Sequence, residues 1–208
     1  MNNPAQEFEQ QRYAVQRHMV PPHALKLALE ATRLNRVHEG YMQWDEHTRA
    51  WGRYCDAMGE ALLLMLHQPL QRRLGLELVP CYSYLRCYTP ESTLPPHVDR
   101  PSCEISVTLP IGSWDSASKW PIWLQANGEN VAVDLSPGDL LVYRGAELRH
   151  WREPLADGVW IQLFLHYVDA NGAYTDYALD QRERLGPVSL AREASPGINL
   201  PRRKEPSG

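Results

Sequence analysis

The sequence has no long hydrophobic run, no closely spaced cysteine pair and no extended basic segment. Its densest apolar run, residues 61–66, is far too short to cross a bilayer. The N-terminus lacks the basic start and apolar stretch of a secretory signal, so we expect a cytoplasmic protein. The 4 cysteines show no CxxC spacing, which indicates buried thiols rather than a disulfide framework.

The charge balance also excludes one class of partner. The net charge is −4, and the basic element at residues 202–204 is short, so nucleic acid is not the expected partner. A chain of 208 residues with 43% hydrophobic and 22% charged residues is typical of one globular domain. We therefore expect a single domain, 1–208, that binds neither nucleic acid nor a membrane. The sequence does not indicate an oligomeric state.

The hydrophobic pattern changes along the chain from helical to strand-like. Apolar residues recur at helical spacing over residues 23–37 and about 45–67, and Pro69 should end or kink the second helix. From residue 76 the pattern becomes short strands separated by turns that contain glycine or proline. The expected strands cover residues 76–88, 104–111, 120–125, 131–135, 140–143 and 160–168.

Short strands with no helices between them predict an antiparallel, double-sheeted fold. We expect a mainly β chain with N-terminal helices and a double-stranded β-helix core, the jelly-roll of cupin-like proteins. Residues 1–75 would form a helical part packed on one sheet, and residues 76–170 the jelly-roll. Residues 171–208 would be an extension with a short helix near 177–184 and a mobile end from residue 195.

Three residues in the strand region have the types and spacing of metal ligands. His97 and Asp99 are two positions apart, so on a strand both side chains point to the same face. His150, on a later strand after a turn at Arg144 and Gly145, would complete the set. Two imidazoles and one carboxylate, with positions left open, are the ligands of non-haem Fe(II) oxygenases. Zinc fits less well, because closed zinc sites take four ligands and usually include cysteine.

Two longer motifs resemble a known family. Residues 88–99 (Tyr-Thr-Pro-Glu-Ser-Thr-Leu-Pro-Pro-His-Val-Asp) are similar to the tyrosine-loop-HxD segment of prolyl-hydroxylase-like Fe(II)/2-oxoglutarate-dependent dioxygenases. Residues 136–143 (Ser-Pro-Gly-Asp-Leu-Leu-Val-Tyr) resemble the turn and strand before that family's distal histidine. The likeness covers roughly residues 78–168.

The resemblance implies a jelly-roll hydroxylase with Fe(II), the cosubstrate 2-oxoglutarate and O2. Oxidative decarboxylation of 2-oxoglutarate would be coupled to hydroxylation of a C–H bond, with ascorbate as an optional reductant. The substrate would be a small molecule or an amino acid residue of a peptide, and the motifs do not identify it because substrate choice depends on loop shape.

The same resemblance places Tyr88 against 2-oxoglutarate, whose far carboxylate requires a cation. Members of the family usually supply it about ten residues after the distal histidine, but residues 160–162 are Trp-Ile-Gln here. Arg152 lies two positions after His150, on the same strand face and about 7 Å further along, so we expect it to bind the C5 carboxylate. Arg86 shares strand parity with Tyr88 and is the second candidate. The alternative for both arginines is an edge position that faces water.

Two further residues adjoin the expected ligands. Arg100 directly follows Asp99 and could bind an anionic group of the substrate, although a single arginine beside a loop often faces solvent. His166, at the end of the last strand, could support a ligand from behind or be a satisfied core histidine.

Two rival functions stay open. Residues 137–150 also resemble the second half of a cupin signature, which would mean a metal enzyme that does not use 2-oxoglutarate. The paired histidine and following glutamate of the first half are absent, however. The other rival is a catalytically inactive jelly-roll binding module, which the lack of a cation at residues 160–162 would suit.

Overall fold

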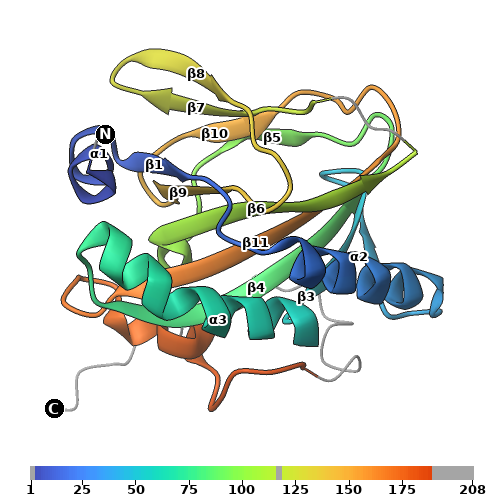
Figure 1. The fold of residues 1–208 in the computed structure, drawn as a ribbon, viewed down its shortest axis with the longest axis horizontal. Helices are drawn as coiled ribbons and strands as arrows, with labels where there is room; N and C mark the ends of the chain where they lie inside the picture. Colours follow the sequence, from blue (N-terminus) through green and yellow to red (C-terminus); the bar gives the residue numbers. More distant parts are fainter. Residues whose placement is uncertain (1–2, 116–118, 189–208) are drawn as a thin grey trace, which may run out of the picture.

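A computed structural model describes residues 3–115 and 119–188 of the chain, which form two facing antiparallel sheets (Figure 1). The larger sheet has the strand order β1-β9-β6-β11-β4-β3-β2 and the smaller one β5-β10-β7-β8. The strands of the larger sheet are β1 (Tyr13–Gln16), β2 (Gln43–Asp45), β3 (Ala50–Tyr54), β4 (Leu78–Tyr88), β6 (Ile105–Trp114), β9 (Leu140–Arg144) and β11 (Val159–Asp169). Those of the smaller sheet are β5 (Leu94–His97), β7 (Ile122–Ala126), β8 (Glu129–Val133) and β10 (His150–Arg152).

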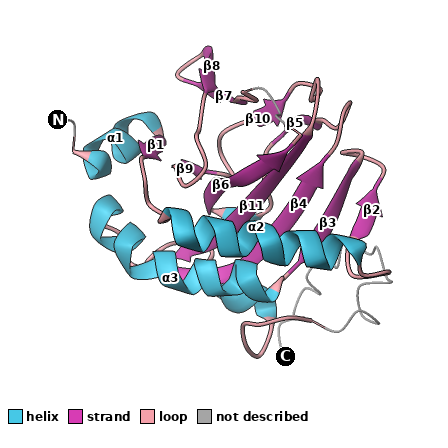
Figure 2. Ribbon diagram, turned by 45° about the vertical axis from the view of Figure 1, so that its right-hand side comes forward, coloured by secondary structure: helices cyan, strands magenta, loops and turns pink. Residues whose placement is uncertain are grey.

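Helices cover one side of this sandwich, as Figure 2 shows. The helices are α1 (Pro4–Gln11), α2 (Pro22–Val37) and α3 (Ala57–Leu74). In the main hydrophobic core, Leu63 and Leu66 of α3 pack with Leu85 and Leu163, which lie on the outer face of the larger sheet. The predicted jelly-roll with helices on one sheet is therefore confirmed. Within the described ranges, no helix combines the length and hydropathy that a membrane span requires.

Strand register fixes which side chains face the space between the sheets. On β4 and β11, Trp160 lies opposite Tyr88, Gln162 opposite Arg86 and His166 opposite Tyr82. Because alternate residues of a strand share a face, these six side chains all lie on the inner face of the larger sheet. The intervening residues, such as Leu85 and Leu163, belong to the core under the helices. One sheet face therefore carries the candidate site and the other carries the core.

The structure differs from the sequence prediction around residues 45–56. Strands β2 and β3 form a hairpin there instead of the first turns of a helix. Trp51 packs edge-on against Trp44 with ring centroids 5.5 Å apart, and β3 pairs along its length with β4. These tertiary contacts outweigh a helical periodicity that extends over only a few turns.

Helix α3 begins and ends at different residues from those expected. Asp56 caps its start, where the Asp56 carboxylate accepts hydrogen bonds from the backbone N–H groups of Met58 (2.9 Å) and Gly59 (3.1 Å). Pro69 does not end the helix, which continues to Leu74 and stops at Gly75 in the left-handed conformation (φ 68°). Pro69 removes one helical hydrogen bond, but the continued helix buries apolar side chains on both sides of it.

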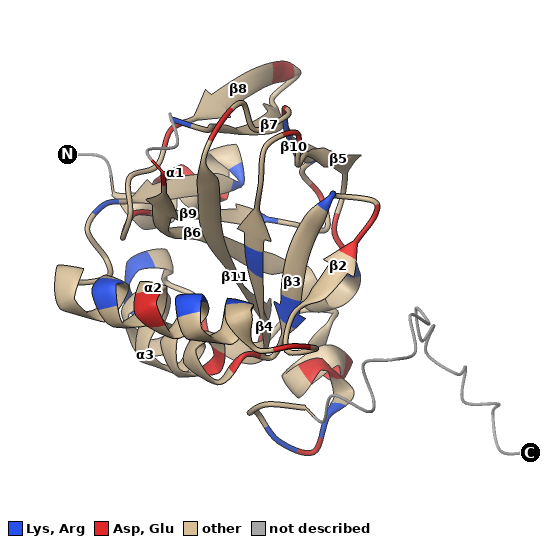
Figure 3. Cartoon of the chain, turned by 90° about the vertical axis from the view of Figure 1, so that its right-hand side faces the viewer, with Lys and Arg blue, Asp and Glu red and all other residues tan. Residues whose placement is uncertain are grey.

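The chain after the last strand turns back along the sheet. A kinked 3-10 segment, η2 (Thr175–Gln181), occupies part of the region where a short helix was expected. The predicted mobile end, residues 195–208, lies outside the described residues. The division at residues 75 and 170 stays a prediction, although three strands from the N-terminal part join the larger sheet. Over the described helices and loops, acidic and basic residues are interspersed (Figure 3).

Candidate metal and cosubstrate site

The three expected metal ligands meet between the sheets. His97 ends β5 and His150 begins β10, and the two residues are direct partners in the ladder between these strands. Their ring centroids are 4.3 Å apart. The Nε2 atoms of His97 and His150 lie 3.4 Å and 3.6 Å from Oδ1 of Asp99. One ligand atom from each residue thus falls within 4.8 Å of the others, close enough to share one metal ion.

Backbone carbonyl groups fix the orientation of both imidazoles. The Nδ1 atom of His97 lies 2.8 Å from the carbonyl oxygen of Pro95, and Nδ1 of His150 lies 2.9 Å from that of Leu148. A carbonyl can only accept, so each Nδ1 carries a proton, and in the neutral form of each imidazole Nε2 presents a lone pair towards Asp99. This is the arrangement in which histidine binds a metal.

Asp99 is held as a carboxylate from several sides. Its backbone N–H donates to the carbonyl of Gly145 (2.9 Å), and the Ser106 hydroxyl donates to Oδ2 (2.8 Å). Burial disfavours its ionisation, but a hydrogen bond from His97 and the positive charge of His150, both present when these imidazoles are protonated at low pH, overcome this effect and lower the pKa of Asp99 to about 2. Asp99 is thus ionised and ready to bind a cation at neutral pH.

Gly145 makes room for this carboxylate. A Cβ atom at this position would overlap Oδ2 of Asp99 and come within 2.5 Å of the carbonyl oxygen of Cys103. Only glycine therefore fits there. The sequence contained a signal for this residue, the Arg144-Gly145 turn before His150, but nothing in the sequence indicated that the turn would contact Asp99.

The two histidine ligands differ in their pKa shifts. Burial lowers the pKa of His97, but its hydrogen bond to Asp99 raises the value above the ordinary one. For His150, burial is the largest effect and the pKa is lowered. His150 is therefore neutral at pH 7, the form in which histidine binds a metal.

Arg152 lies deeper in the same space and has only neutral partners. It is 1% exposed, and its guanidinium donates to the carbonyl of Trp120 and, over 3.2 Å, to Oε1 of Gln162. Among the described residues, no carboxylate lies within ion-pair distance of Arg152, and its Nε has no hydrogen-bond partner. Burial lowers the pKa of Arg152 to about 10, so it is still charged at neutral pH.

Tyr88 and Trp120 adjoin this arginine. The Trp120 ring lies 4.7 Å from the guanidinium carbon of Arg152 and packs edge-on against Tyr88, with centroids 4.8 Å apart. Tyr88 is fully buried, and its hydroxyl has no hydrogen-bond partner within the described ranges. This end of the site thus combines an uncompensated cation with a free hydroxyl donor.

Arg86 lies on the inner face of the larger sheet, but its charge is already neutralised. It forms an ion pair with Asp45 at 2.9 Å and donates a hydrogen bond to the Thr48 hydroxyl. Both partners lie at or just beyond the end of β2, in the hairpin that the sequence did not predict. The proposed contact of Arg86 with a cosubstrate stays a prediction, and it would have to compete with this ion pair.

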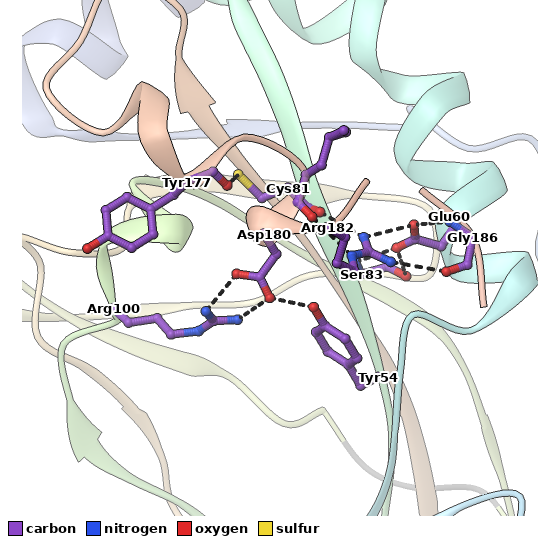
Figure 4. A network of polar contacts seen from close by, with 10 residues as sticks. Tyr54, Glu60, Cys81, Ser83, Arg100, Tyr177, Asp180, Arg182 and Gly186 are labelled. Carbon is purple, nitrogen blue, oxygen red and sulfur yellow. Dashed lines mark hydrogen bonds and ion pairs between the residues drawn. The ribbon is translucent and has the colours of Figure 1, made fainter. Parts of the chain in front are cut away.

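Arg100 does not extend freely into solvent. Its guanidinium donates two hydrogen bonds to Asp180, at 2.7 Å and 2.9 Å (Figure 4). It also lies 4.6 Å from the centre of the Tyr82 ring. Its side chain is half exposed. A role in substrate binding stays a prediction for Arg100, and the bidentate contact with Asp180 would have to open.

His166 lies behind the ligands, where the sequence suggested a supporting role. Its Nδ1 lies 3.0 Å from the Ser106 hydroxyl, which also contacts Asp99. Burial lowers the pKa of His166 to about 4, so it is neutral. Sequence reasoning missed Ser106 and Gln162, because a serine and a glutamine on strands carry no distinctive motif.

We compared the chain with known families, curated proteins and solved structures. No protein-family model and no curated protein matches the chain. Among solved structures, a Pseudomonas putida prolyl-4-hydroxylase is 16% identical with a TM-score of 0.63, over 78% of this chain and 95% of that one. This chain has the fold of the 2OG-Fe(II) oxygenases.

Two other similar structures contain ligands or a peptide. HygX from Streptomyces hygroscopicus, with nickel and 2-oxoglutarate bound, is 13% identical, with a TM-score of 0.64, over 90% of this chain and 96% of that one. A Trichoplax adhaerens prolyl hydroxylase, in complex with a hypoxia inducible factor peptide fragment, is 15% identical, with a TM-score of 0.66, over 81% and 88%. Identities this low establish the shared fold, and the chemistry must be argued from the residues.

Proposed function

We propose that the protein is an oxygenase that uses Fe(II) and 2-oxoglutarate to hydroxylate an organic substrate. The observation that carries the proposal is the convergence of two Nε2 lone pairs and one ionised carboxylate at His97, Asp99 and His150. Two nitrogen donors and one oxygen donor on one face suit Fe(II) and leave coordination positions for other groups.

The residues around these ligands fit the cosubstrate as well. Arg152 and Tyr88 carry buried polar atoms without partners in the part of the chain that the structure describes. Both face the space between the sheets, Arg152 from β10, which also carries His150, and Tyr88 from β4. Iron and 2-oxoglutarate bound here would supply oxidative decarboxylation to succinate and CO2, coupled to transfer of oxygen from O2 to a C–H bond. The protein contributes the metal ligands, the cation and an apolar wall that excludes water.

Arg152 is our candidate for the C5 carboxylate of 2-oxoglutarate. A buried guanidinium without an anion is unfavourable, and a bound carboxylate would compensate it with two parallel hydrogen bonds. The Tyr88 hydroxyl would donate to the same molecule. Arg86 is the weaker candidate because Asp45 already neutralises it.

The proposed substrate is a peptide or a small molecule. The similar solved structures include a prolyl hydroxylase with a peptide and an epimerase from nogalamycin biosynthesis, so this fold accommodates both peptides and small molecules. We propose one of these two classes, with no nucleic acid or membrane partner. A cytoplasmic location would suit the buried free thiols at Cys55, Cys81, Cys87 and Cys103.

An anaerobic titration tests the proposal. Fe(II) followed by 2-oxoglutarate should produce the visible charge-transfer band of the chelate, and addition of O2 should release succinate. The matched controls are succinate in place of 2-oxoglutarate, which cannot chelate in the same way, and the His150→Ala variant. Metal binding with no response to 2-oxoglutarate would favour the cupin-type alternative, and no metal binding would favour an inactive module.

A further inference from the structure

The segment after the last strand is fastened to the body of the protein by buried polar contacts (Figure 4). Arg182 donates to the carbonyl of Cys81 (2.9 Å) and to Oε2 of Glu60 (3.3 Å), which also accepts from the backbone N–H of Gly186 (2.9 Å). The other oxygen of Glu60 accepts from the backbone N–H and hydroxyl of Ser83. Helix α3, strand β4 and the segment of residues 175–188 thus meet at one buried carboxylate.

Asp180 forms a second attachment, on the side of the metal ligands. Its two carboxylate oxygens accept from the guanidinium of Arg100 at 2.7 Å and 2.9 Å, and Oδ2 also accepts from the Tyr54 hydroxyl. Bidentate contacts of this kind fix both distance and orientation, which a single point charge does not.

Arg100 connects this attachment to the metal site, because it directly follows Asp99. Arg100 caps the short 3-10 turn of residues 101–103, where its carbonyl accepts from the backbone N–H of Cys103 (2.9 Å). Its guanidinium stacks on Tyr82, whose ring lies 4.4 Å from that of His166. Asp99 is therefore held by Ser106 through its side chain and by Asp180 through the neighbouring residue.

The backbone around Asp180 has an intrinsically unfavourable conformation. Leu179, Asp180 and Gln181 have φ values of 54°, 53° and 60°, the left-handed region that residues other than glycine rarely occupy. Three consecutive residues of this kind persist only where tertiary contacts hold them. The segment therefore depends on its partners, and the Arg100 contact is one of the strongest.

We propose that Asp180 is a positioning residue for the metal ligand Asp99, and that docking of residues 175–188 and metal binding stabilise each other. This inference rests on the proposed metal site. Thermodynamic linkage makes the effect reciprocal: if the docked segment strengthens metal binding, bound metal must strengthen docking by the same factor.

Measurements of metal affinity test whether docking of the segment strengthens metal binding. Titration calorimetry with Mn(II), which does not oxidise readily, would compare the wild type with Asp180→Asn and Asp176→Asn. Asp176 lies in the same segment and is exposed, so its variant removes the same charge without the Arg100 contact. We expect about tenfold weaker binding in Asp180→Asn, within the usual range of coupling, and wild-type affinity in Asp176→Asn.

Hydrogen exchange tests the reciprocal effect, that bound metal strengthens docking of the segment. Mn(II) should slow the exchange of backbone amides in residues 175–188 of the wild type and of Asp176→Asn, and should leave Asp180→Asn unchanged. A contribution of Asp180 to general stability alone would not produce this metal-dependent difference.

The outcomes separate this inference from the proposed function. If the wild type binds no metal, both fail. If the wild type and Asp180→Asn bind Mn(II) equally, or if Asp176→Asn is weakened as much as Asp180→Asn, the positioning role is wrong and the metal site stands. Should Asp180→Asn not fold, Tyr54→Phe and Arg100→Lys weaken the same contact more gently, and unchanged affinity in both would overturn the inference.

Discussion

The two ends of the candidate site differ in how their charges are compensated. At the metal end, the Nδ1 atoms of His97 and His150 are bonded to backbone carbonyls, and Asp99 is bonded to Ser106 and Gly145. At the other end, the buried cation Arg152 has neutral partners only, within the part of the chain that the structure describes. One end is preorganised by the protein itself, whereas the other requires an anion.

This difference distinguishes a structural charge from a charge kept for a ligand. Arg86 lies on the inner face of the larger sheet, whereas Arg152 comes from the smaller sheet, and Arg86 differs in having an acidic partner, Asp45. A buried ion without a counter-ion is expensive, so a chain retains one where a ligand supplies the missing charge. Arg152 therefore indicates an anionic ligand more strongly than Arg86 does, although both are arginines that face the space between the sheets.

The largest effect should follow from removing a ligand at the preorganised end. In His150→Ala, we expect loss of stoichiometric metal binding and of 2-oxoglutarate-dependent succinate release, with the fold retained. Metal analysis and circular dichroism would check both points. His23→Ala changes an exposed histidine on α2 and should behave as the wild type. Full metal content with normal turnover in His150→Ala would remove His150 from the site.

The next largest effect concerns the other end. Arg152→Ala should raise the apparent Kd for 2-oxoglutarate roughly 30-fold or more, because truncating one partner of a buried charge pair costs about 2–5 kcal/mol. Arg152→Lys keeps the charge but loses the bidentate contact, so the apparent Kd for 2-oxoglutarate should rise less than in Arg152→Ala. Mn(II) affinity should change little in either variant. An unaltered 2-oxoglutarate affinity in Arg152→Ala would transfer the role to Arg86.

The two ends should also respond differently to pH. The pKa of His166 is lowered by burial to about 4, from 6.5 in the unfolded chain, so between these values the unfolded state binds more protons. The contribution of His166 to the stability of the metal-free protein should therefore be fully present above pH 6.5 and fall by up to about 3 kcal/mol as the pH drops towards 4. The pKa of Arg152, about 10, adds no change in this window.

Urea unfolding in the presence of a chelator at several pH values would measure this dependence. His166→Gln should remove the His166 contribution and so reduce the loss of stability between pH 6.5 and 4. His23→Gln, at an exposed position, should leave the dependence as in the wild type. An unchanged pH dependence in His166→Gln would show that His166 is not the group responsible.

The smallest expected effect is on stability, where two arginine variants should shift the free energy of unfolding in opposite directions. Without 2-oxoglutarate, Arg152→Met should raise the free energy of unfolding by about 1 kcal/mol, because it replaces an uncompensated buried charge with an apolar side chain. Arg86→Met should lower it, because Asp45 loses its ion-pair partner. Denaturant unfolding of both variants would measure the two shifts. Destabilisation by Arg152→Met equal to that by Arg86→Met would mean that the two ends are compensated alike.

Local sequence signals predicted the fold where they were repeated over many residues. Alternating strands from residue 76 onward and the turns between them led to the jelly-roll, and the structure confirms it. The prediction was wrong around residues 45–56, where a short helical pattern yielded to strand pairing with β4. Pro69 also does not end helix α3, which continues to Leu74.

The sequence by itself determined the chemical groups of the site and their strand parity. His97 and Asp99 face the same way because a strand alternates, and Arg152 follows His150 for the same reason. Only the tertiary structure decided which charges were already compensated. Asp45 neutralises Arg86 and Asp180 holds Arg100, while Arg152 is left with neutral partners among the described residues. Side-chain pairing across distant strands depends on the fold as a whole, so no local pattern encodes it.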